Sequence, residues 1–140
     1  MAEGTKLEIV SPERLVMSEQ VSSVTVPGTD GYFTVLGDHA PLMTTLKPGF
    51  VTAIGDGGAS HVFYVRGGFA DISPAGLTIL AEEAREAADF QRAEIEALIT
   101  ERQQELDAAP TPEARAMLQN ELDAWRNLLI DAAVSTHTAH

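Results

Sequence analysis

Residues 24–49 read VTVPGTDGYFTVLGDHAPLMTTLKPG, in which short β-branched segments alternate with clusters of turn-forming residues. Val24 and Val26 flank Thr25, an alternation expected of a strand with one buried face. The Pro-Gly and Asp-Gly pairs that follow supply a fixed φ or a positive φ, as tight turns require. The stretch therefore predicts antiparallel strands joined by short turns.

The same pattern continues on both sides, from the N-terminus to about Leu80. Strand-like segments occupy residues 7–9 and 62–65, and glycine or proline clusters separate the segments. Turn clusters that recur about every 8–12 residues are typical of an antiparallel sandwich or barrel. We therefore expect an N-terminal antiparallel β-sandwich over residues 1–82.

The composition changes after Leu80. All 11 glycines precede this point, and alanine, glutamate, leucine, arginine and glutamine dominate after it. From Asp89 to about Asp107 the apolar residues recur three, four or seven positions apart, which predicts a helix with one narrow apolar stripe. Asp89 is predicted to be its N-cap, because the carboxylate can accept hydrogen bonds from the first free backbone N–H groups.

Two prolines then separate this helix from a second one. Pro110 and Pro112 end the first helix, and Thr111 followed by Pro112 supplies an N-cap and a first-turn proline for the next. The short loop predicts an antiparallel helical hairpin over residues 83–140, with a frayed tail, so the fold class is α+β. We expect the hairpin to dock on the β-domain or on a partner, because one narrow apolar stripe per helix buries too little surface for independent stability.

The chain is strongly acidic, with 9 Lys and Arg against 21 Asp and Glu and a formal net charge of −12. Residues 1–80 contribute −4 of this charge and residues 81–140 contribute −8. The balance disfavours nucleic acid and anionic membrane surfaces as partners, because both attract positive charge. The absence of cysteine excludes disulfides, thiolate catalysis and cysteine-bound metal centres.

The sequence contains no motif of an active site. A GxxxxGK[ST] phosphate loop, a GxSxG nucleophile elbow and an HExxH zinc motif are all absent. The four histidines are His39, His61, His137 and His140. His39 is expected to be a surface or interface residue, and His137 and His140 to lie in a frayed terminus rather than at a metal. We therefore expect no catalytic residue, no metal and no enzymatic activity of the chain itself.

Several motifs lie in a fixed order along the β-rich part. They are VPGTDG at residues 26–31, HAPL at 39–42, KPG at 47–49, GGF at 67–69 and LTILAE at 77–82. This order, with a strand region followed by a helical hairpin, resembles the epsilon subunit of F-type ATP synthase over essentially the whole chain. The resemblance implies a non-catalytic rotor subunit that binds the gamma subunit and rests on the c-ring, so that ring rotation is coupled to the catalytic head.

The resemblance also assigns contact residues for the c-ring and gamma. Thr29, Asp30, Gly31 and Tyr32 correspond to the loop that faces the c-ring, and His39, Ala40, Pro41 and Leu42 lie in the same interfacial region. Asp30 is expected to pair with basic polar loops, and Tyr32 to be a contact residue. For the glycines of this turn, simple turn formation is an equally well founded explanation. Such a subunit would be peripheral at the cytoplasmic face of the bacterial inner membrane, reaching the membrane only through the complex.

The hairpin suggests a regulatory role. In many relatives it extends along gamma and contacts the alpha/beta head transiently, where basic residues of the second helix help to inhibit ATP hydrolysis. The second helix here has only Arg115 and Arg126 as bases, against the acids Glu113, Glu121, Asp123 and Asp131. Like charges would face one another, so we expect weak inhibition. The alternative is a docked hairpin that acts mainly as a solvated brace.

Some members of this family bind ATP in the folded hairpin through an [Ile/Leu]-Asp-x-x-Arg-Ala motif. Residues 88–93 read ADFQRA, which matches the Asp, Arg and Ala but not the leading aliphatic residue. The candidate residues for ATP as a regulatory ligand are Asp89, Arg92, Arg115 and Arg126. Capping and surface charge explain Asp89 and Arg92 equally well. No other cofactor is expected.

A hypothesis of a different class is a small regulatory binding protein. It would use the β-domain for a ligand and the hairpin for dimerisation, and it predicts a soluble dimer with a concave apolar pocket. The rotor hypothesis instead predicts a monomer that co-purifies with gamma.

Overall fold

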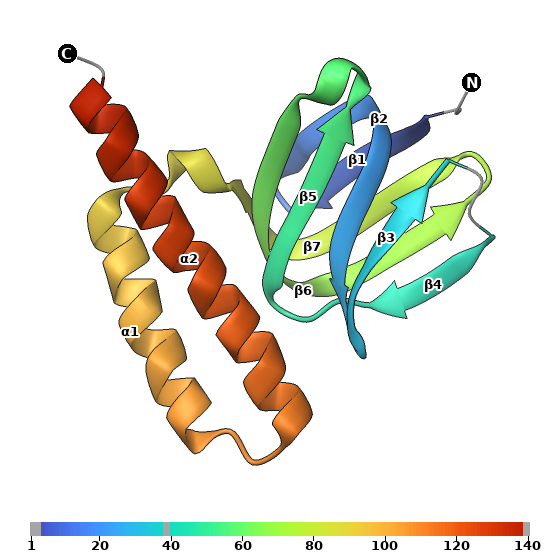
Figure 1. Ribbon diagram of the computed structural model, residues 1–140. Coiled ribbons are helices and arrows are strands. Elements are labelled where there is room, and N and C mark those ends of the chain that lie inside the picture. The colour runs from blue at the N-terminus through green and yellow to red at the C-terminus, as the bar shows by residue number, and fades with distance from the viewer. Residues whose placement is uncertain (1–3, 38–39, 139–140) are drawn as a thin grey trace. The chain divides into compact units, whose positions relative to one another are not determined.

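The computed structural model describes residues 4–37 and 40–138 (Figure 1). The chain divides into two compact units, Met1–Ala88 and Asp89–His140, and each is described by itself. The first is all β and the second is helical, as the change in composition predicts. No helix of the described residues combines the length and the apolar character needed to cross a membrane.

The β unit contains seven strands and a short 3₁₀ helix. They are β1 (Thr5–Ser11), β2 (Arg14–Gly28), β3 (Gly31–Leu36), β4 (Leu42–Thr45), β5 (Gly49–Gly55), η1 (Asp56–Gly58), β6 (Ser60–Ser73) and β7 (Gly76–Glu86). All strand pairs are antiparallel except β1 with β7, which is parallel. The hydrogen-bonded order is β1-β7-β6-β5-β2-β3, with β4 added alongside β6.

The two long strands β2 and β6 belong to both layers of the sandwich. The first part of β2 pairs with β1, and its second part pairs with β3 and β5. Likewise β6 pairs with β5 at residues 60–65 and with β4 at residues 69–72. Between these segments Gly67 and Gly68 have φ of 71° and 112°, which bends the strand. The chain thereby passes from one layer to the other without a loop.

The core follows from the alternation of apolar residues along the strands. Leu7 and Ile9 of β1 are fully buried, whereas Lys6, which precedes Leu7 and points to the other face, is exposed. Val24 and Val26 of β2 are buried in the same way, as residues 24–49 predict. These residues belong to a single apolar cluster to which most of the strands contribute.

The β unit extends past the boundary predicted after residue 82. Strand β7 continues to Glu86 because Tyr64 pairs with Arg85 and Phe63 with Glu86. The sequence of this segment, AEEARE, favours a helix by intrinsic propensity. Pairing with β6 overrides that propensity, and Ala81 and Ala84 both reach the core although the strict alternation of buried residues ends at Ala81.

The second unit is the predicted antiparallel hairpin, formed by α1 (Arg92–Ala108) and α2 (Pro112–Thr138). The predicted role of Asp89 as N-cap is wrong, because Asp89 lies in a short 3₁₀ helix, η2 (Ala87–Asp89). The N-cap is Gln91, which forms a reciprocal capping box with Glu94; the backbone N–H of Gln91 donates to Glu94 Oε1 at 2.8 Å. This box satisfies the first free N–H groups without a carboxylate at the cap.

The start of α2 agrees with the sequence. Pro112 is its first residue, and the backbone N–H of Ala114 donates to Thr111 Oγ1 at 3.1 Å. Thr111 is therefore the N-cap and Pro112 the first-turn proline, as predicted.

Candidate interaction surfaces

The turn between β2 and β3 presents the predicted c-ring contact residues. Thr29 and Asp30 are exposed at its tip, and Gly31 adopts a φ of 127°. The hydroxyl of Thr29 donates to the carbonyl of Thr45 at 3.1 Å, and the N–H of Lys47 donates to the carbonyl of Pro27 at 2.9 Å. The turn is therefore fastened to the end of β4 and to the segment that follows it.

Tyr32 has a structural role that the sequence did not indicate. Its hydroxyl accepts a hydrogen bond from the backbone N–H of Phe50 at 3.1 Å. A β-carbon at Gly49 would lie 2.6 Å from the same hydroxyl oxygen, so only glycine leaves room for it there. Tyr32 thus ties β3 to the start of β5, and its half-buried ring lines the surface described next.

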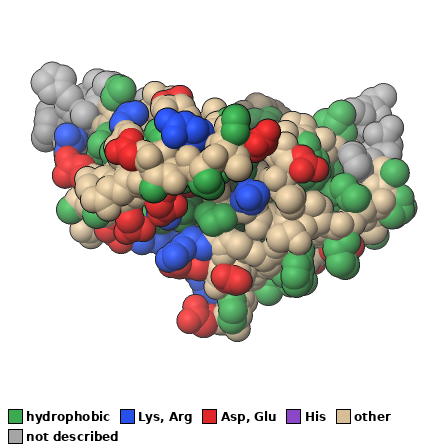
Figure 2. All heavy atoms as spheres, turned by 90° about the horizontal axis from the view of Figure 1, so that it is seen from below, with side chains coloured by type: hydrophobic (Ala, Val, Ile, Leu, Met, Phe, Trp, Pro, Cys, Tyr) green, Lys and Arg blue, Asp and Glu red, His purple; other side chains and the backbone are tan. Residues whose placement is uncertain are grey.

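An open hollow of about 360 Å³ lies beside this turn. It is lined by residues 28–33 of the β2–β3 segment and by Leu42 and Thr44 of β4. The structure therefore brings the turn Thr29 to Tyr32 together with Leu42, which the sequence placed in one interfacial region. Ala40 and Pro41 are exposed just before β4, whereas His39 lies outside the described residues. In Figure 2 the molecule is seen from below, the side to which the β2–β3 turn points in Figure 1.

A second surface of the β unit was not predicted. It is a row of apolar side chains on the outer side of the sheet, which we call the apolar row, and its members are Val10, Leu15, Met43, Phe69 and Leu80. Four of them are unusually exposed: Leu15 by 54%, Met43 by 67%, Phe69 by 47% and Leu80 by 42%.

Strand register makes the apolar row continuous. Leu80 lies opposite Phe69 on β6 and beside Val10 on β1, and Val10 lies opposite Leu15 on β2. Met43 on β4 is diagonal to Phe69, within reach of a long side chain. The row thus crosses five strands. Sequence patterning could not find it, because only the register shows that these outward positions are neighbours.

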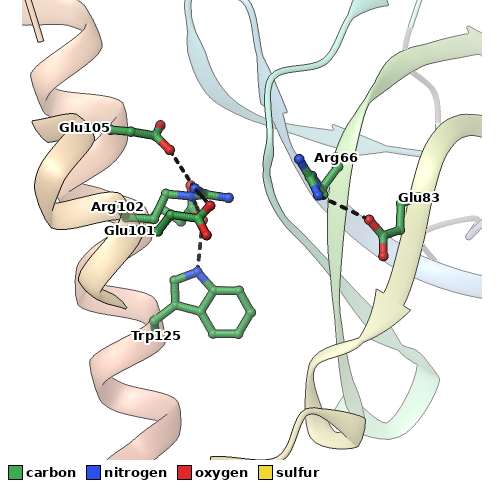
Figure 3. A network of polar contacts seen from close by, with 7 residues as sticks. Arg66, Glu83, Glu101, Arg102, Glu105 and Trp125 are labelled. Atoms are coloured by element: carbon green, nitrogen blue, oxygen red, sulfur yellow. Dashed lines mark hydrogen bonds and ion pairs between the residues drawn. The ribbon is translucent and has the colours of Figure 1, made fainter. Parts of the chain in front are cut away.

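Acidic residues border the apolar row. Asp71 follows Phe69 on the same side of β6, and Glu8 precedes Val10 on the same side of β1. Thr78 lies between them, since it pairs with both Asp71 and Glu8. Arg66 and Glu83 form an exposed ion pair of 3.6 Å on the same two strands, β6 and β7 (Figure 3).

The candidate nucleotide residues contact different parts of the hairpin. Arg92 Nε lies 3.2 Å from Glu96 Oε2. Arg115 donates to the carbonyl oxygens of Leu106 and Ala109, at 3.4 and 3.5 Å, and so helps to cap the C-terminal end of α1.

The remaining candidates also have other neighbours. Arg126 donates to Gln103 Oε1 on α1 at 3.0 Å, and Asp89 belongs to η2. Each arginine thus has a partner within the hairpin, and ATP binding by Asp89, Arg92, Arg115 and Arg126 stays a prediction.

The hairpin contains a buried charged cluster that the sequence analysis missed. Arg102 of α1 is only 5% exposed, and Glu121 of α2 is only 3% exposed. Arg102 occupies a position of the apolar stripe, four residues before Leu106, and Glu121 stands four residues before Trp125. That spacing was the available signal, but periodicity arguments assign charged residues to the solvent face.

No group of three His, Cys, Asp or Glu side chains within residues 4–37 and 40–138 could hold a metal ion. The surfaces of the β unit instead suit contacts with other macromolecules, since one is apolar and the other combines an exposed acid with aromatic and aliphatic side chains.

Comparisons with known proteins agree with this architecture. A family model for the β-sandwich domain of the ATP synthase delta/epsilon chain matches residues 5–87. The chain is 48% identical over 128 residues to the ATP synthase epsilon chain of Mesorhizobium japonicum, covering 91% of this chain and 95% of the relative. It is also 48% identical over 131 residues to the epsilon chain of Hyphomonas neptunium, covering 91% and 96%.

A solved structure shows the same fold. A chain of the Euglena gracilis mitochondrial ATP synthase superposes with a TM-score of 0.66 at 19% identity, covering 96% of this chain and 83% of that one. The resemblance drawn from the sequence motifs is confirmed by the identity to the two bacterial relatives. The chain belongs to the ATP synthase epsilon chain family.

Proposed function

We propose that the chain is a non-catalytic rotor subunit in the central stalk of a proton-translocating ATP synthase. There it couples rotation of the c-ring to the catalytic head through the gamma subunit. The observation that supports the proposal is the presence of two surfaces suited to contacts, the apolar row and the hollow, on one sandwich core. Transmission of torque needs firm contacts on a stiff body and no reaction centre.

Strand β4 contributes to both surfaces. Leu42 and Thr44 line the hollow, whereas Met43 between them belongs to the apolar row. We assign the apolar row to gamma, because permanent interfaces are more apolar than transient ones. We assign the hollow to the polar loops of the c-ring, because Asp30 at its rim can pair with a basic side chain. A single strand would then connect the two partners.

The hairpin is the regulatory part of this proposal. Contact with the alpha/beta head is transient and inhibits hydrolysis only weakly, because α2 has few bases and Arg115 and Arg126 are already engaged by α1. The subunit is peripheral, at the cytoplasmic face of the bacterial inner membrane. ATP is at most a regulatory ligand, and titration of the isolated protein with ATP in a calorimeter tests for it.

The test of the rotor function is co-purification. The native protein is captured from detergent-solubilised membranes, and we expect gamma and c to be recovered with it. Phe69→Lys should abolish recovery of gamma, because it places a charge within the apolar row, between Leu80 and Met43. Leu36→Lys is the matched control: Leu36 is 54% exposed on β3 and is not part of the row, so this variant should behave as wild type.

Two outcomes would contradict the proposal. Recovery of the native protein as a soluble dimer without gamma or c would favour the regulatory binding protein instead. Equal recovery of gamma with the Phe69 and Leu36 variants would remove the apolar row as the gamma surface.

A further inference from the structure

A buried polar cluster joins the two helices of the hairpin. Arg102 Nε of α1 donates to Glu121 Oε2 of α2 at 2.9 Å, and Trp125 Nε1 donates to the same oxygen at 2.9 Å (Figure 3). The side chains of Arg102 and Glu121 are only 7% and 4% exposed. The contact between the helices therefore depends on ionised groups that are removed from water.

One guanidinium faces three carboxylates in this cluster. Arg102 Nη1 also lies 3.0 Å from Glu101 Oε1 and 2.7 Å from Glu105 Oε2, both on α1 and both exposed. Arg102 thus neutralises the acidic side of α1 where Glu121 of α2 approaches it. Without this cation, Glu121 would be buried near two like charges.

The cluster makes the contact releasable. A buried ion pair adds little net stability relative to its hydrated ions, whereas removing one partner is strongly unfavourable. Among the side chains that the structure describes on the two helices, the buried apolar ones are Ile95 and Leu106 on α1 and Leu122 and Trp125 on α2. When the helices separate, both ions regain water, which offsets part of the lost packing. An apolar pair at the same positions would have no such compensation.

We propose that Arg102, Glu121 and Trp125 form a latch whose release opens the hairpin, so that Arg102 controls how often α2 separates from α1. The regulatory role of the latch rests on the proposed function, because an opened hairpin is the form that could reach the catalytic head. The latch itself is a property of the isolated chain and can be tested there.

Trp125 reports directly on the latch, because it is the only tryptophan of the chain. Acrylamide quenching of its fluorescence is measured on the full-length protein. Arg102→Met should shift the hairpin toward the open form by about a hundredfold, as expected when one partner of a buried ion pair is lost, and quenching should rise. The double variant Arg102→Met/Glu121→Leu should return quenching to the wild-type level or below it, because an apolar pair replaces the ions.

Arg66→Met provides the matched control, since it removes the exposed Arg66–Glu83 pair of the β unit and should leave quenching unchanged. The latch is overturned if quenching in Arg102→Met equals wild type, or if the double variant is quenched as strongly as the single one. The second result would mean that loss of Arg102 disturbs the hairpin by a route other than the charge left on Glu121.

A distance measurement separates opening from unfolding. The chain has no cysteine, so spin labels can be placed at Ala97→Cys on α1 and Asn127→Cys on α2, both exposed positions. With Arg102→Met we expect a longer distance between the labels at retained helical circular dichroism; an unchanged distance, or loss of the helical signal, overturns the latch. Co-purification with gamma is scored separately, so failure of the latch and failure of the rotor proposal are distinguishable.

Discussion

At the scale of single residues, Asp30 is the side chain of the hollow that best distinguishes a binding role from a structural one. It is exposed at the rim of the hollow, whereas Tyr32 and Gly31 each have a structural reason to be where they are. A residue that does not stabilise the fold can be changed without disturbing it. Asp30 is therefore the residue on which the c-ring assignment can be tested cleanly.

Asp30→Lys should weaken attachment to the c-ring by about tenfold or more, because it replaces an attractive charge by a repulsive one at a basic partner. The measurement is the dissociation constant of the purified protein for stalk-depleted membranes. Glu19→Lys makes the same charge change at an exposed position of β2 outside the hollow and should bind as wild type. Equal binding by both variants would exclude the hollow as the ring surface.

Gly68 is the residue on which the passage of β6 between the two layers depends. Its φ is 112°, and a β-carbon there would collide with the carbonyl oxygen of Leu80. Gly68→Ala should therefore lower the free energy of unfolding of the β unit by about 3 kcal/mol, the upper end expected for local backbone strain. Gly57→Ala separates backbone strain from collision. Gly57 has a φ of 85°, and a β-carbon there would have no neighbour within 4 Å. This variant should therefore lower the free energy of unfolding by only about 1 kcal/mol. Equal denaturation midpoints for Gly68→Ala and Gly57→Ala would contradict a collision at Gly68.

At the scale of elements, periodicity predicted most of the fold. The alternation around Val24 and the three-to-four spacing around Ile95 each reflect burial of one face, and the structure has a strand and a helix there. The prediction failed where long-range pairing decided the outcome. The segment AEEARE continues as a strand because β6 holds it, and no local pattern carries that information.

The candidate sites likewise divide into one that the sequence motifs predicted and others that depend on long-range pairing. Motif order placed the Thr29 to Tyr32 turn and Leu42 together, and they do line one hollow. The apolar row depends on register between five strands, so it could not be predicted from the chain alone. The pairing of Arg102 with Glu121 depends likewise on how two helices are set against each other.

The first turn of α1 offers a test at this scale. Glu94→Ala removes the reciprocal half of the capping box with Gln91, and it should cost the helix about 1 kcal/mol. Hydrogen exchange at the amides of residues 92–95 should then be about fivefold faster. Glu96→Ala, which loses only the exposed pair with Arg92, should change exchange little. Unchanged exchange in Glu94→Ala would mean that the capping box does not stabilise the first turn of α1.

At the scale of the whole molecule, we propose that attachment belongs to one of the two units and regulation to the other. Both proposed contact surfaces belong to Met1–Ala88, and the net charge of −12 divides equally, with −6 in Met1–Ala88 and −6 in the shorter unit Asp89–His140. The β unit has its own apolar cluster, so its contacts should not depend on the hairpin. For the proposed contact with the catalytic head we expect like charges to face one another, so an acidic hairpin should bind there only weakly.

Removal of residues 89–140 tests this division. The truncated protein should still recover gamma and c, and ATP hydrolysis by the assembled enzyme should rise by less than about twofold, as expected for loss of weak surface contacts. Conversely, Glu113→Lys/Asp123→Lys in the full-length chain changes two exposed acids of α2 into bases and should strengthen inhibition. The hydrolysis rate at fixed ATP is measured for the three assembled enzymes. A sharp rise on truncation, with no effect of the charge reversal, would mean that the hairpin inhibits through contacts other than charge.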